Sequence, residues 1–300
     1  MYLLLGSSNA LTNRLWSKLR AAGQSAMFLN PHSFPADLLV AYDAQTPCHG
    51  HVLYQPNRPP LNLQDIEGIY WWFYDGIGHP PGDGTYFETE TVFLNLLENL
   101  SCRWVNHPGT IRDHIYKPAQ LQLALSLGAT IPDTLVSNDA QALKAFVAAH
   151  GQVMLKNVSA TGVPKRVSDP ALVDELLLNA PCTRPVMLQA FIAGTDVRAH
   201  VIDQAIYTTE ILSQHDVSKI DIEQPLRHTL PDDVATLCLA INQAFGLVLS
   251  GIDFRKTADG QYYFLEANPS PQYPVYEDRN GYPISQRIVD YLMHGKAVSA

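Results

Sequence analysis

The feature that most constrains the fold of this chain is the segment 251–268. Two runs rich in apolar and aromatic residues flank the pair Asp259-Gly260 in this segment. An Asp-Gly pair between two such runs is the strongest short-range signal for a β-hairpin. We therefore predict two paired antiparallel strands, with Asp253 on the first strand and Glu266 and Asn268 on the second.

These three polar residues form a candidate metal site. Side chains alternate between the two faces along a strand, so Glu266 and Asn268 point the same way, and a suitable register sets Asp253 beside them. Two carboxylates and an amide oxygen are ligands of the type that Mg²⁺ prefers, usually completed by substrate phosphates and water. The alternative is an ordinary hairpin whose acidic side chains face solvent, and these residues alone do not decide between the two.

Composition describes a globular chain of enzyme size. The sequence has 300 residues, of which 46% are hydrophobic and 16% charged, enough for one to three cores. No apolar run approaches the roughly 18 residues of a membrane span, and residues 1–6 lack the basic start and length of a signal peptide. We therefore expect a cytoplasmic protein with no membrane partner.

Charge and cysteine content narrow the function further. The net charge of −9 argues against a general nucleic-acid binder, although a local basic pocket for phosphates is compatible with it. The four cysteines are scattered without paired spacing, so the sequence indicates free thiols and neither a disulfide framework nor a zinc site. They are Cys48, Cys102, Cys182 and Cys238.

The pattern of elements divides the chain into three units. Residues 1–106 alternate strand-like and helical runs, which predicts a small N-terminal α/β domain. Residues 107–192 and 193–300 then mix helices and strands, and the hairpin lies in the last unit. The helices that we predict cover residues 11–22, 86–100, 111–127, 170–179, 231–245 and 284–293, with one more after Asn138-Asp139, and a long polar connection follows residue 211.

Among the basic residues, Lys156 has a sequence context that favours binding of an anion. Lys156 ends the apolar run 153–155, whose neighbours would partly strip water from the ammonium group and strengthen its attraction for an anion. The alternative is a strand-end lysine that reaches solvent. Lys117 lies in a helical pattern and would by itself be a surface residue. Arg198 shares a strand face with Asp196, so an exposed salt bridge is the alternative explanation for it.

The order of several short segments resembles that of the ATP-grasp superfamily of carboxylate ligases, from about residue 106 to residue 292. No single segment is specific, and the resemblance depends on finding them all in one order. They are Asn106-His107-Pro108 with Lys117, 128–136, Val153-Met154-Leu155-Lys156, 188–198, Gly251-Ile252-Asp253 and 264–269.

This resemblance implies an ATP-grasp fold of mixed α/β and α+β class. Residues 1–106 would form the pre-ATP-grasp domain, 107–192 the central and lid subdomains, and 193–300 the metal-binding subdomain. It also implies an ADP-forming ligase that uses ATP and Mg²⁺ to convert a carboxylate into an acyl phosphate, which an amine or hydroxyl then attacks. By position, Lys117 and Lys156 would contact ATP phosphates, backbone groups of Gln189, Ala190, Phe191 and Ile192 would hold adenine, Arg198 would lie near the transferred phosphoryl group, and Asp253, Glu266 and Asn268 would bind Mg²⁺.

A narrower resemblance is to the microviridin or graspetide maturases, which modify ribosomally made peptides, and more distantly to the ribosomal-protein glutamate ligase. Segments 210–214 and 280–285 are similar to that group. The chain departs from it at Asp221-Ile222-Glu223, where the group has aspartate, tryptophan and arginine, and at Ala190, which replaces an acidic residue.

These departures put the substrate in doubt more than the use of ATP. The resemblance implies a peptide or protein carboxylate as substrate. A small-molecule carboxylate-amine ligase and a catalytically weak ATP-binding partner subunit stay open as alternatives, and so does the oligomeric state, a homodimer included.

Overall fold

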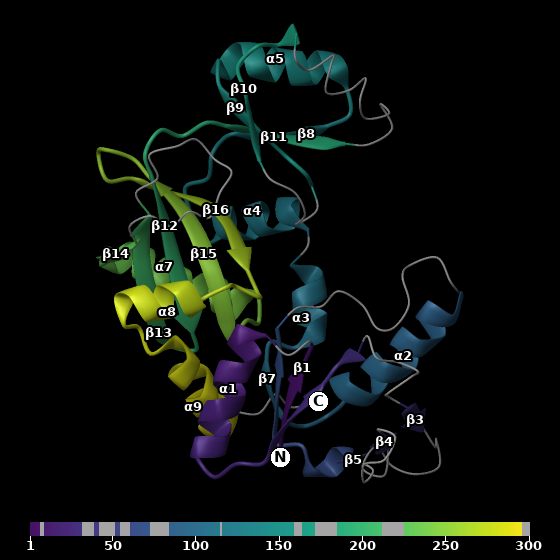
Figure 1. Cartoon of the computed structure of the whole chain (residues 1–300). Helices are drawn as coiled ribbons and strands as arrows, with labels where there is room; N and C mark the ends of the chain where they lie inside the picture. Colours follow the sequence, from purple (N-terminus) through teal and green to yellow (C-terminus); the bar gives the residue numbers. More distant parts are fainter. Residues whose placement is uncertain are drawn as a thin grey trace.

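A computed structural model describes most of the chain, namely residues 1–6, 9–31, 39–41, 52–54, 61–72, 84–114, 116–158, 164–171, 185–211 and 225–295. Figure 1 shows these residues in an elongated arrangement. A parallel sheet lies at one end, a five-stranded sheet in the middle, and a four-stranded sheet at the other end. In that order, we call them the N-terminal, five-stranded and central sheets. The central sheet is named for its place in the sequence, between the other two, and not for its place in the molecule.

The N-terminal sheet is parallel and buried on both faces. Its strands run in the order β2-β1-β6-β7 and have the bounds Ala26–Leu29, Tyr2–Leu5, Gly68–Trp71 and Arg103–Val105. Alternate residues of β1 enter two different cores, because Leu3 packs on one face of the sheet and Leu4 on the other. A continuous apolar run is typical of such a doubly covered strand.

Helices and a small second sheet accompany this sheet. Helix α1 (Ala10–Ala21) begins after Asn9, whose side chain accepts the N–H groups of Leu11 and Thr12 and so caps the helix. The other elements are α2 (Gly84–Glu98), the 3-10 helix η3 (Leu63–Asp65) and a small antiparallel sheet of β3 (Leu39–Ala41), β4 (Val52–Tyr54) and β5 (Leu61–Asn62).

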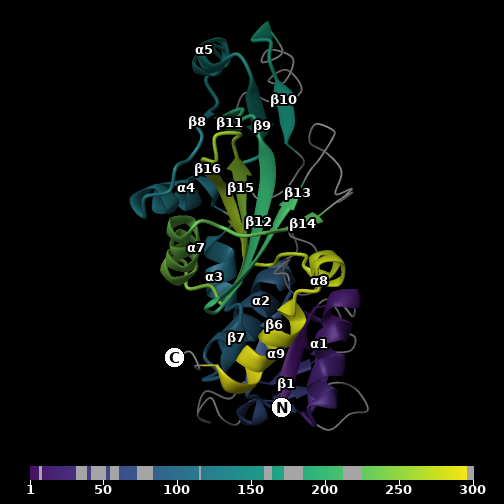
Figure 2. The same cartoon turned by 90° about the vertical axis from the view of Figure 1, so that its left-hand side faces the viewer.

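The last helix of the chain completes the core of the N-terminal sheet. Helices α8 (Pro274–Asn280) and α9 (Ile284–His294) follow the hairpin, and α9 lies beside α1 (Figure 2). Ile288 and Leu292 of α9 are fully buried in the same cluster as Leu4 and Leu15. The domain limits given above stay a prediction, but this packing joins residues near both ends of the sequence.

The central sheet is antiparallel, and helix α5 (Ala140–His150) packs against it. Its order is β10-β9-β11-β8, with bounds Lys165–Val167, Val153–Lys156, Val186–Ala190 and Thr134–Ser137. Leu143 and Val147 of α5 pack against Val153 and Leu188. The helix predicted over 170–179 lies outside the described residues except at its first two positions.

The five-stranded sheet is antiparallel and contains the predicted hairpin. Its order is β14-β13-β12-β15-β16, with bounds Pro225–His228, Ala205–Ile211, Thr195–Ile202, Leu249–Lys256 and Tyr262–Asn268. Strands β15 and β16 pair across the turn at Asp259-Gly260, which confirms the hairpin. Strand β14 was not predicted, because it lies in the region that we expected to be a polar connection.

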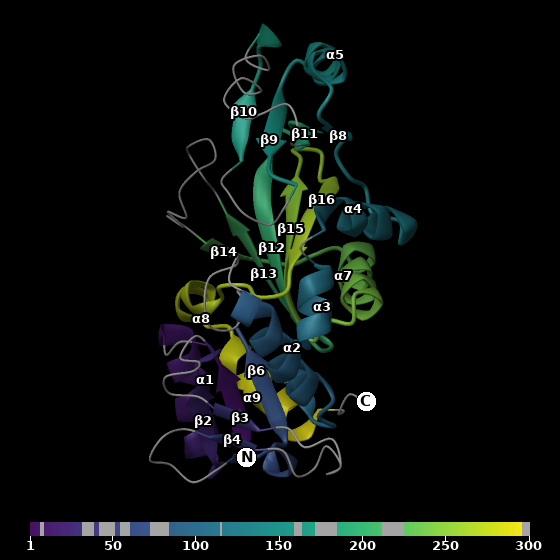
Figure 3. The ribbon, with the colours of Figure 1, turned by 90° about the vertical axis from the view of Figure 1, so that its right-hand side faces the viewer.

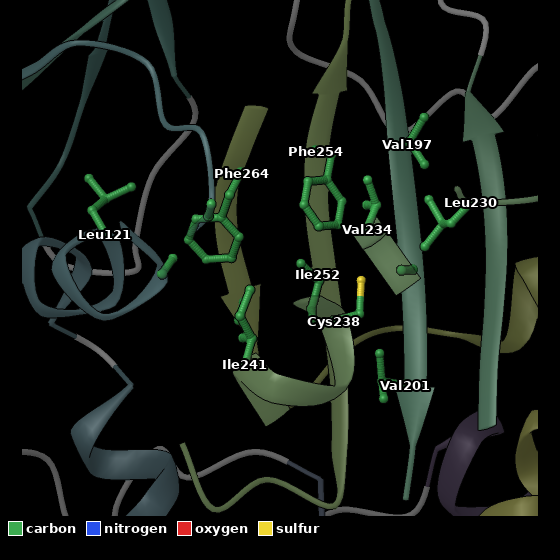
Figure 4. Packing of buried hydrophobic residues seen from close by; sticks show 14 of the residues in the cluster. Leu121, Val197, Val201, Leu230, Val234, Cys238, Ile241, Ile252, Phe254 and Phe264 are labelled. Carbon is green, nitrogen blue, oxygen red and sulfur yellow. The ribbon is translucent and has the colours of Figure 1, made fainter. Parts of the chain in front are cut away.

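Two helices cover one face of the five-stranded sheet. Helices α7 (Asp232–Ala244) and α4 (Lys117–Ser126) lie on the side opposite to α8 (Figures 2 and 3). Figure 4 shows the core on that side, where Phe254, Phe264 and Ile252 of the hairpin meet Cys238 and Ile241 of α7. The hairpin therefore packs a mostly apolar face against α7, and the carboxylates of Asp253 and Glu266 lie on the other face.

The single helix predicted over residues 111–127 is wrong. The structure has two helices, α3 (Pro108–Asp113), which ends at Asp113, and α4, which begins at Lys117. Pro118 explains the break, because it has no N–H to donate and its ring would clash with the carbonyl of His114 in a continuous helix. Lys117 is consequently the first residue of α4 and not a mid-helix residue.

Asn106 fixes the connection between the N-terminal sheet and α3. Its Nδ2 donates to the carbonyls of Leu249 and Pro269, both at 2.7 Å. Its Oδ1 accepts the N–H groups of Val248 at 2.9 Å and Leu249 at 3.0 Å. The buried amide thus uses its full hydrogen-bonding capacity and ties this connection to the start of β15 and the end of β16.

Two further expectations concern the membrane and the cysteines. Within the described ranges, the structure has no helix of the length and apolar character needed to cross a membrane. Cys102 and Cys238 are free thiols, as predicted, and both are buried. Cys48 and Cys182 lie outside the described residues.

The packing of α9 leads to a stability prediction. Leu292→Ala should lower the free energy of unfolding by about 2–5 kcal/mol, because it leaves a cavity in a fully buried cluster. Leu125→Ala is the control, since Leu125 is 56% exposed on α4 and its loss should cost little. Urea denaturation followed by circular dichroism measures both, and equal midpoints for the two variants would contradict the role of α9.

Candidate active site

A row of charged residues crosses the five-stranded sheet on the face opposite to the apolar core. Arg198 on β12 is the register partner of Asp253 on β15, and Asp253 is the partner of Glu266 on β16. Register partners of antiparallel strands share a face, so the three side chains lie together. The metal site predicted from the sequence depended on a register that sets Asp253 beside Glu266, and the structure has this register.

Arg198 and Asp253 form a bidentate ion pair. The Nε and Nη2 atoms of Arg198 donate to the two carboxylate oxygens of Asp253, each at 2.6 Å. Burial raises the pKa of Asp253, and Arg198 opposes that rise. Burial lowers the pKa of Arg198, but the adjacent carboxylate outweighs it, and the pKa ends above its ordinary value. The ring of Tyr276 on α8 lies 5.8 Å from the guanidinium carbon, and its hydroxyl is 3.4 Å from Nη1.

The first turn of α4 holds Lys117 beside the row. Its Nζ lies 3.2 Å from Oε2 of Glu266. Gln120, one turn further along α4, accepts the N–H of Ala267 at 3.0 Å and donates to the carbonyl of His114 at 2.5 Å. Because these bonds tie α4 to β16, the position of Lys117 relative to Glu266 is fixed by the backbone of both elements.

Lys156 reaches the site from the central sheet. Its Nζ donates to Oε1 of Gln189 at 2.6 Å, and Gln189 in turn donates to the hydroxyl of Thr134 at 3.1 Å. Burial lowers the pKa of Lys156. Its hydrogen-bond partner is a neutral amide, so no carboxylate contacts the ammonium directly and this position is open to an anionic ligand.

Residues 191–194 connect the central sheet to the five-stranded sheet. The N–H of Ala190 donates to the backbone carbonyl of Asp133 at 2.8 Å, and the N–H of Phe191 donates to the backbone carbonyl of Gln152 at 3.0 Å. Within the part of the chain that the structure describes, the N–H of Ile192 donates no hydrogen bond. Its carbonyl accepts Nε of Arg255 at 3.0 Å. Among the described residues the N–H groups of Ala193 and Gly194 donate none either, so the connection presents unused backbone donors at residues 192–194.

Gly194 allows this connection to approach β15 closely. Its φ is +154°, and a Cβ at this position would lie 2.0 Å from the carbonyl oxygen of Lys256. Any other residue would collide with the backbone of β15, so glycine is required where the two sheets meet.

Arg255 is a site residue that the sequence did not single out. Its Nη1 donates to Asp196 at 2.7 Å. Asp196 therefore pairs with Arg255, whereas the alternative explanation for Arg198 was a salt bridge between Arg198 and Asp196. The guanidinium also lies 5.8 Å from the centre of the Phe191 ring. The signal that could have found it is its spacing of two from Asp253 along a strand, which places both on one face.

One cavity of about 290 Å³ brings these groups together between the central and five-stranded sheets. Nine of the ten predicted site residues line it. They are Lys117, Lys156, Gln189, Ala190, Phe191, Ile192, Arg198, Asp253 and Glu266. The remaining lining residues were not predicted to belong to a site. They are Pro132, Met154, Pro164, Asp196, Ile211, Arg255 and Leu265.

Asn268 is the predicted residue that does not line the cavity. It lies two positions beyond Glu266 on the same face of β16, opposite Gly251, and its Oδ1 accepts the N–H of Ser270 at 2.8 Å. The departure at Asp221-Ile222-Glu223 lies outside the described residues, so its place relative to the cavity is not given.

The cavity combines cations with a pair of carboxylates. Among the described residues no group of three or more His, Cys, Asp or Glu side chains could hold a metal ion by itself. Asp253 and Glu266 could hold a hard divalent cation whose remaining ligands come from water or from a bound oxyanion. Lys117, Lys156 and Arg198 are placed to neutralise such an oxyanion. The arrangement is suited to a polyphosphate with a divalent cation.

Comparison with known proteins identifies relatives of this chain. The RimK-like ATP-grasp domain family matches residues 117–292. A probable alpha-L-glutamate ligase of Haemophilus influenzae (strain PittEE) is 22% identical over 280 residues, which cover 83% of this chain and 85% of that protein.

Two solved structures share the fold along the whole chain. The macrocyclase MdnC from Microcystis aeruginosa MRC, bound with precursor peptide MdnA, has a TM-score of 0.83 at 22% identity and covers 98% of this chain and 99% of its own. The ATP-grasp ligase PsnB, complexed with a phosphomimetic variant of a minimal precursor, Mg and ADP, has a TM-score of 0.80 at 23% identity and covers 98% of each chain.

The ion pair of Arg198 and Asp253 leads to a second prediction. Asp253→Ala should destabilise the fold by roughly 2–3 kcal/mol, because it leaves a guanidinium without its partner. This is less than for a fully buried pair, since the two side chains keep 24% and 19% of their surface exposed. The double variant Arg198→Met with Asp253→Leu should recover most of the loss in urea denaturation. A double variant no more stable than the single one would contradict this account.

Proposed function

The chain belongs to the RimK-like ATP-grasp family and is an ATP-grasp ligase, and we propose that it uses ATP and Mg²⁺ to join a carboxylate of a peptide or protein to an amine or hydroxyl. The fold class and the enzyme class predicted from the sequence are confirmed by the family match and the structural likeness. The observation that carries the proposal is the convergence of Lys117, Lys156 and Arg198 on the carboxylates of Asp253 and Glu266 in one cavity.

The cavity has the features that a nucleotide needs. The unused N–H of Ile192 is a donor for a ring nitrogen of adenine, and Ala190 and Phe191 beside it are apolar. Met154 and Leu265 add further apolar surface for a purine. In this proposal Lys156 binds phosphate oxygens, since its contact with Gln189 leaves its charge without a carboxylate partner.

The carboxylates of Asp253 and Glu266 fit a magnesium site. Each of them already accepts from a basic side chain, but a carboxylate has about four lone-pair positions and retains capacity for a metal. Asn268, on the same strand face, is the third ligand in this proposal. When bound, Mg²⁺ would neutralise charge on the phosphates, as it does in phosphoryl-transfer enzymes generally.

In this proposal Arg198 stabilises the negative charge on the phosphoryl group that is transferred from ATP. In the proposed reaction a carboxylate oxygen of the substrate attacks the terminal phosphorus of ATP, and the bond to ADP breaks. The amine or hydroxyl then attacks the carbonyl carbon of the acyl phosphate, and phosphate leaves with the bonding electrons. Arg198 is held rigidly by Asp253, so it offers a preorganised positive charge at the phosphoryl group during the first step.

The structural neighbours support a peptide as the substrate. Both MdnC and PsnB are described in complex with a precursor peptide. The relative from Haemophilus influenzae is described as a probable glutamate ligase, which supports a carboxylate as the group that is activated. The proposal combines the two and assigns a peptide or protein carboxylate to this chain.

The nucleotide product tests the proposed chemistry. With ATP, Mg²⁺, hydroxylamine as a surrogate nucleophile and pools of acidic peptides or amino acids, we expect ADP and phosphate, and no AMP, because the terminal phosphoryl group is transferred. Arg198→Ala should lower kcat by about 10²–10³ and change ATP affinity much less. Arg287→Ala is the control, since Arg287 is an exposed arginine on α9 that contacts Tyr207.

Chromatography of the nucleotides gives the decisive result. AMP and pyrophosphate that appear only with substrate would overturn the mechanism. ATP-to-ADP conversion that persists at the wild-type rate in Glu266→Gln would overturn the metal assignment.

A fourth prediction concerns ATP affinity. Lys156→Ala should weaken ATP binding by about 1.5–3 kcal/mol, the range for a hydrogen bond to a charged group, and should hardly change the binding of adenosine, which has no phosphates. Lys165→Ala on the exposed strand β10 is the control. In calorimetric titrations, an equal loss for ATP and adenosine would show that Lys156 has a structural role.

A further inference from the structure

One guanidinium spans the end of the connection between the central and five-stranded sheets. The Nε atom of Arg255 donates to the carbonyl of Ile192 at 3.0 Å, and its Nη1 atom donates to Oδ1 of Asp196 at 2.7 Å. Asp196 is also the register partner of Arg255 in the ladder between β12 and β15. The side chain of Arg255 keeps only 16% of its surface exposed, so water competes little for these bonds. Arg255 therefore ties Ile192 to β15.

The residue before Ile192 is also in contact with this guanidinium. The centre of the Phe191 ring lies 5.8 Å from the guanidinium carbon of Arg255 and 4.0 Å from that of Arg166. Both distances are in the range of a cation–π contact. The peptide group that carries the N–H of Ile192 thus lies between the ring contacts of Phe191 and the bond to the Ile192 carbonyl. Of the two, the hydrogen bond is the directional contact and fixes the orientation of the backbone.

Ile192 offers the donor that a ligand in the cavity can reach. Among the described residues, the N–H groups of Ile192, Ala193 and Gly194 donate no hydrogen bond. Ile192 lines the cavity, whereas Ala193 and Gly194 do not. A site built around such a donor rejects a ligand that cannot accept its hydrogen bond, because the donor is then left unpaired. The rejection is strong only if the donor cannot turn away, and this is what Arg255 prevents.

Capping of a helix does not explain Arg255. The Nε atom of Arg103 also donates to a backbone carbonyl, that of Leu292 at 2.8 Å, but this carbonyl lies in the last turn of α9, where carbonyls lack partners within the helix. Ile192 precedes a strand and ends no helix. Arg103 and Leu292 do not line the cavity. Arg103 thus provides a matched comparison for the bond alone.

We propose that Arg255 is a positioning residue that makes the site selective for adenine, by holding Ile192 so that its N–H donates to N1 of the base. This inference rests on the proposed function and concerns its nucleotide. With the phosphates at Lys156, the ribose-bearing edge of the purine faces the charged part of the cavity, and N1 lies on the opposite edge. N1 of adenine accepts a hydrogen bond. In hypoxanthine N1 carries a hydrogen, so a fixed donor would meet a second donor and both would lack an acceptor.

The affinities for ATP and inosine triphosphate (ITP) test this role. The two nucleotides differ in the base alone, so the ratio of their dissociation constants, measured by calorimetry with Mg²⁺ on one protein preparation, is independent of phosphate binding and of the folded fraction. Wild-type protein should bind ATP about tenfold or more tightly than ITP. Arg255→Met should reduce the ratio to about threefold or less, mainly by weakening ATP binding, because Ile192 is no longer held. Arg255→Lys should give an intermediate ratio, since an ammonium lacks the fork that reaches Ile192 and Asp196 together.

Two control variants separate the bond to Ile192 from other effects of losing an arginine. Arg103→Met removes an equivalent bond outside the cavity and should leave the ratio within about twofold of the wild-type value. Arg166→Met removes the closer contact with the Phe191 ring but keeps both bonds of Arg255, so it should lower the ratio less than Arg255→Met does. An equal fall in Arg255→Met and in either control would overturn the role of Arg255.

Three further results decide the inference. A wild-type ratio near one, or a wild-type protein that binds neither nucleotide, would overturn it. An unchanged ratio in Arg255→Lys would also overturn it, which keeps the test decisive if Arg255→Met does not fold. ADP release with hydroxylamine is measured separately. Selective binding of ATP without ADP release would reject the proposed ligase activity on the substrates tried and support the role of Arg255, whereas ADP release without selectivity would do the reverse.

Discussion

The register between β12, β15 and β16 is the constraint on which the site depends. A slip of one residue would move every side chain of a strand to the opposite face. The apolar partners on the core side oppose such a slip, since Val197, Phe254 and Phe264 are almost completely buried against α7 and α4. The hydrophobic effect on one face therefore fixes the positions of Asp253 and Glu266 on the other. Because the proposed chemistry needs these charges within a few ångströms of each other, the core and the site cannot be varied independently.

The second requirement of the site is that two sheets contribute to it. Lys156 comes from the central sheet, whereas Arg198 and Asp253 come from the five-stranded sheet. The short connection at residues 191–194 joins them, and the contacts of Arg255 and Gly194 hold it against β15. The cavity is thus bounded by two separate cores, and a bound nucleotide in the proposed position would contact both. Binding energy from one ligand would then orient the two sheets with respect to each other.

Local patterns predicted the parts of the fold that local physics decides. The Asp-Gly turn and the alternation of side chains predicted the hairpin. The resemblance in segment order supplied most of the ten candidate residues, of which nine line one cavity. The break before Lys117 was missed because the helical periodicity was given more weight than Pro118. The partner of Arg255 and the position of α9 depend on contacts between residues far apart in sequence. Periodicity carries no information on such contacts, so only the folded structure shows them.

The position of α9 also has a consequence for synthesis of the protein. Strand β1 leaves the ribosome long before α9, but Leu4 is buried in part by Leu292, which is added almost 290 residues later. At about 5–20 residues per second, one face of the N-terminal sheet stays without its covering helix for roughly 15 to 60 seconds. During that time the nascent chain presents an apolar surface to the cell. The N-terminal unit therefore completes its fold after translation of the hairpin and not domain by domain from the first residue.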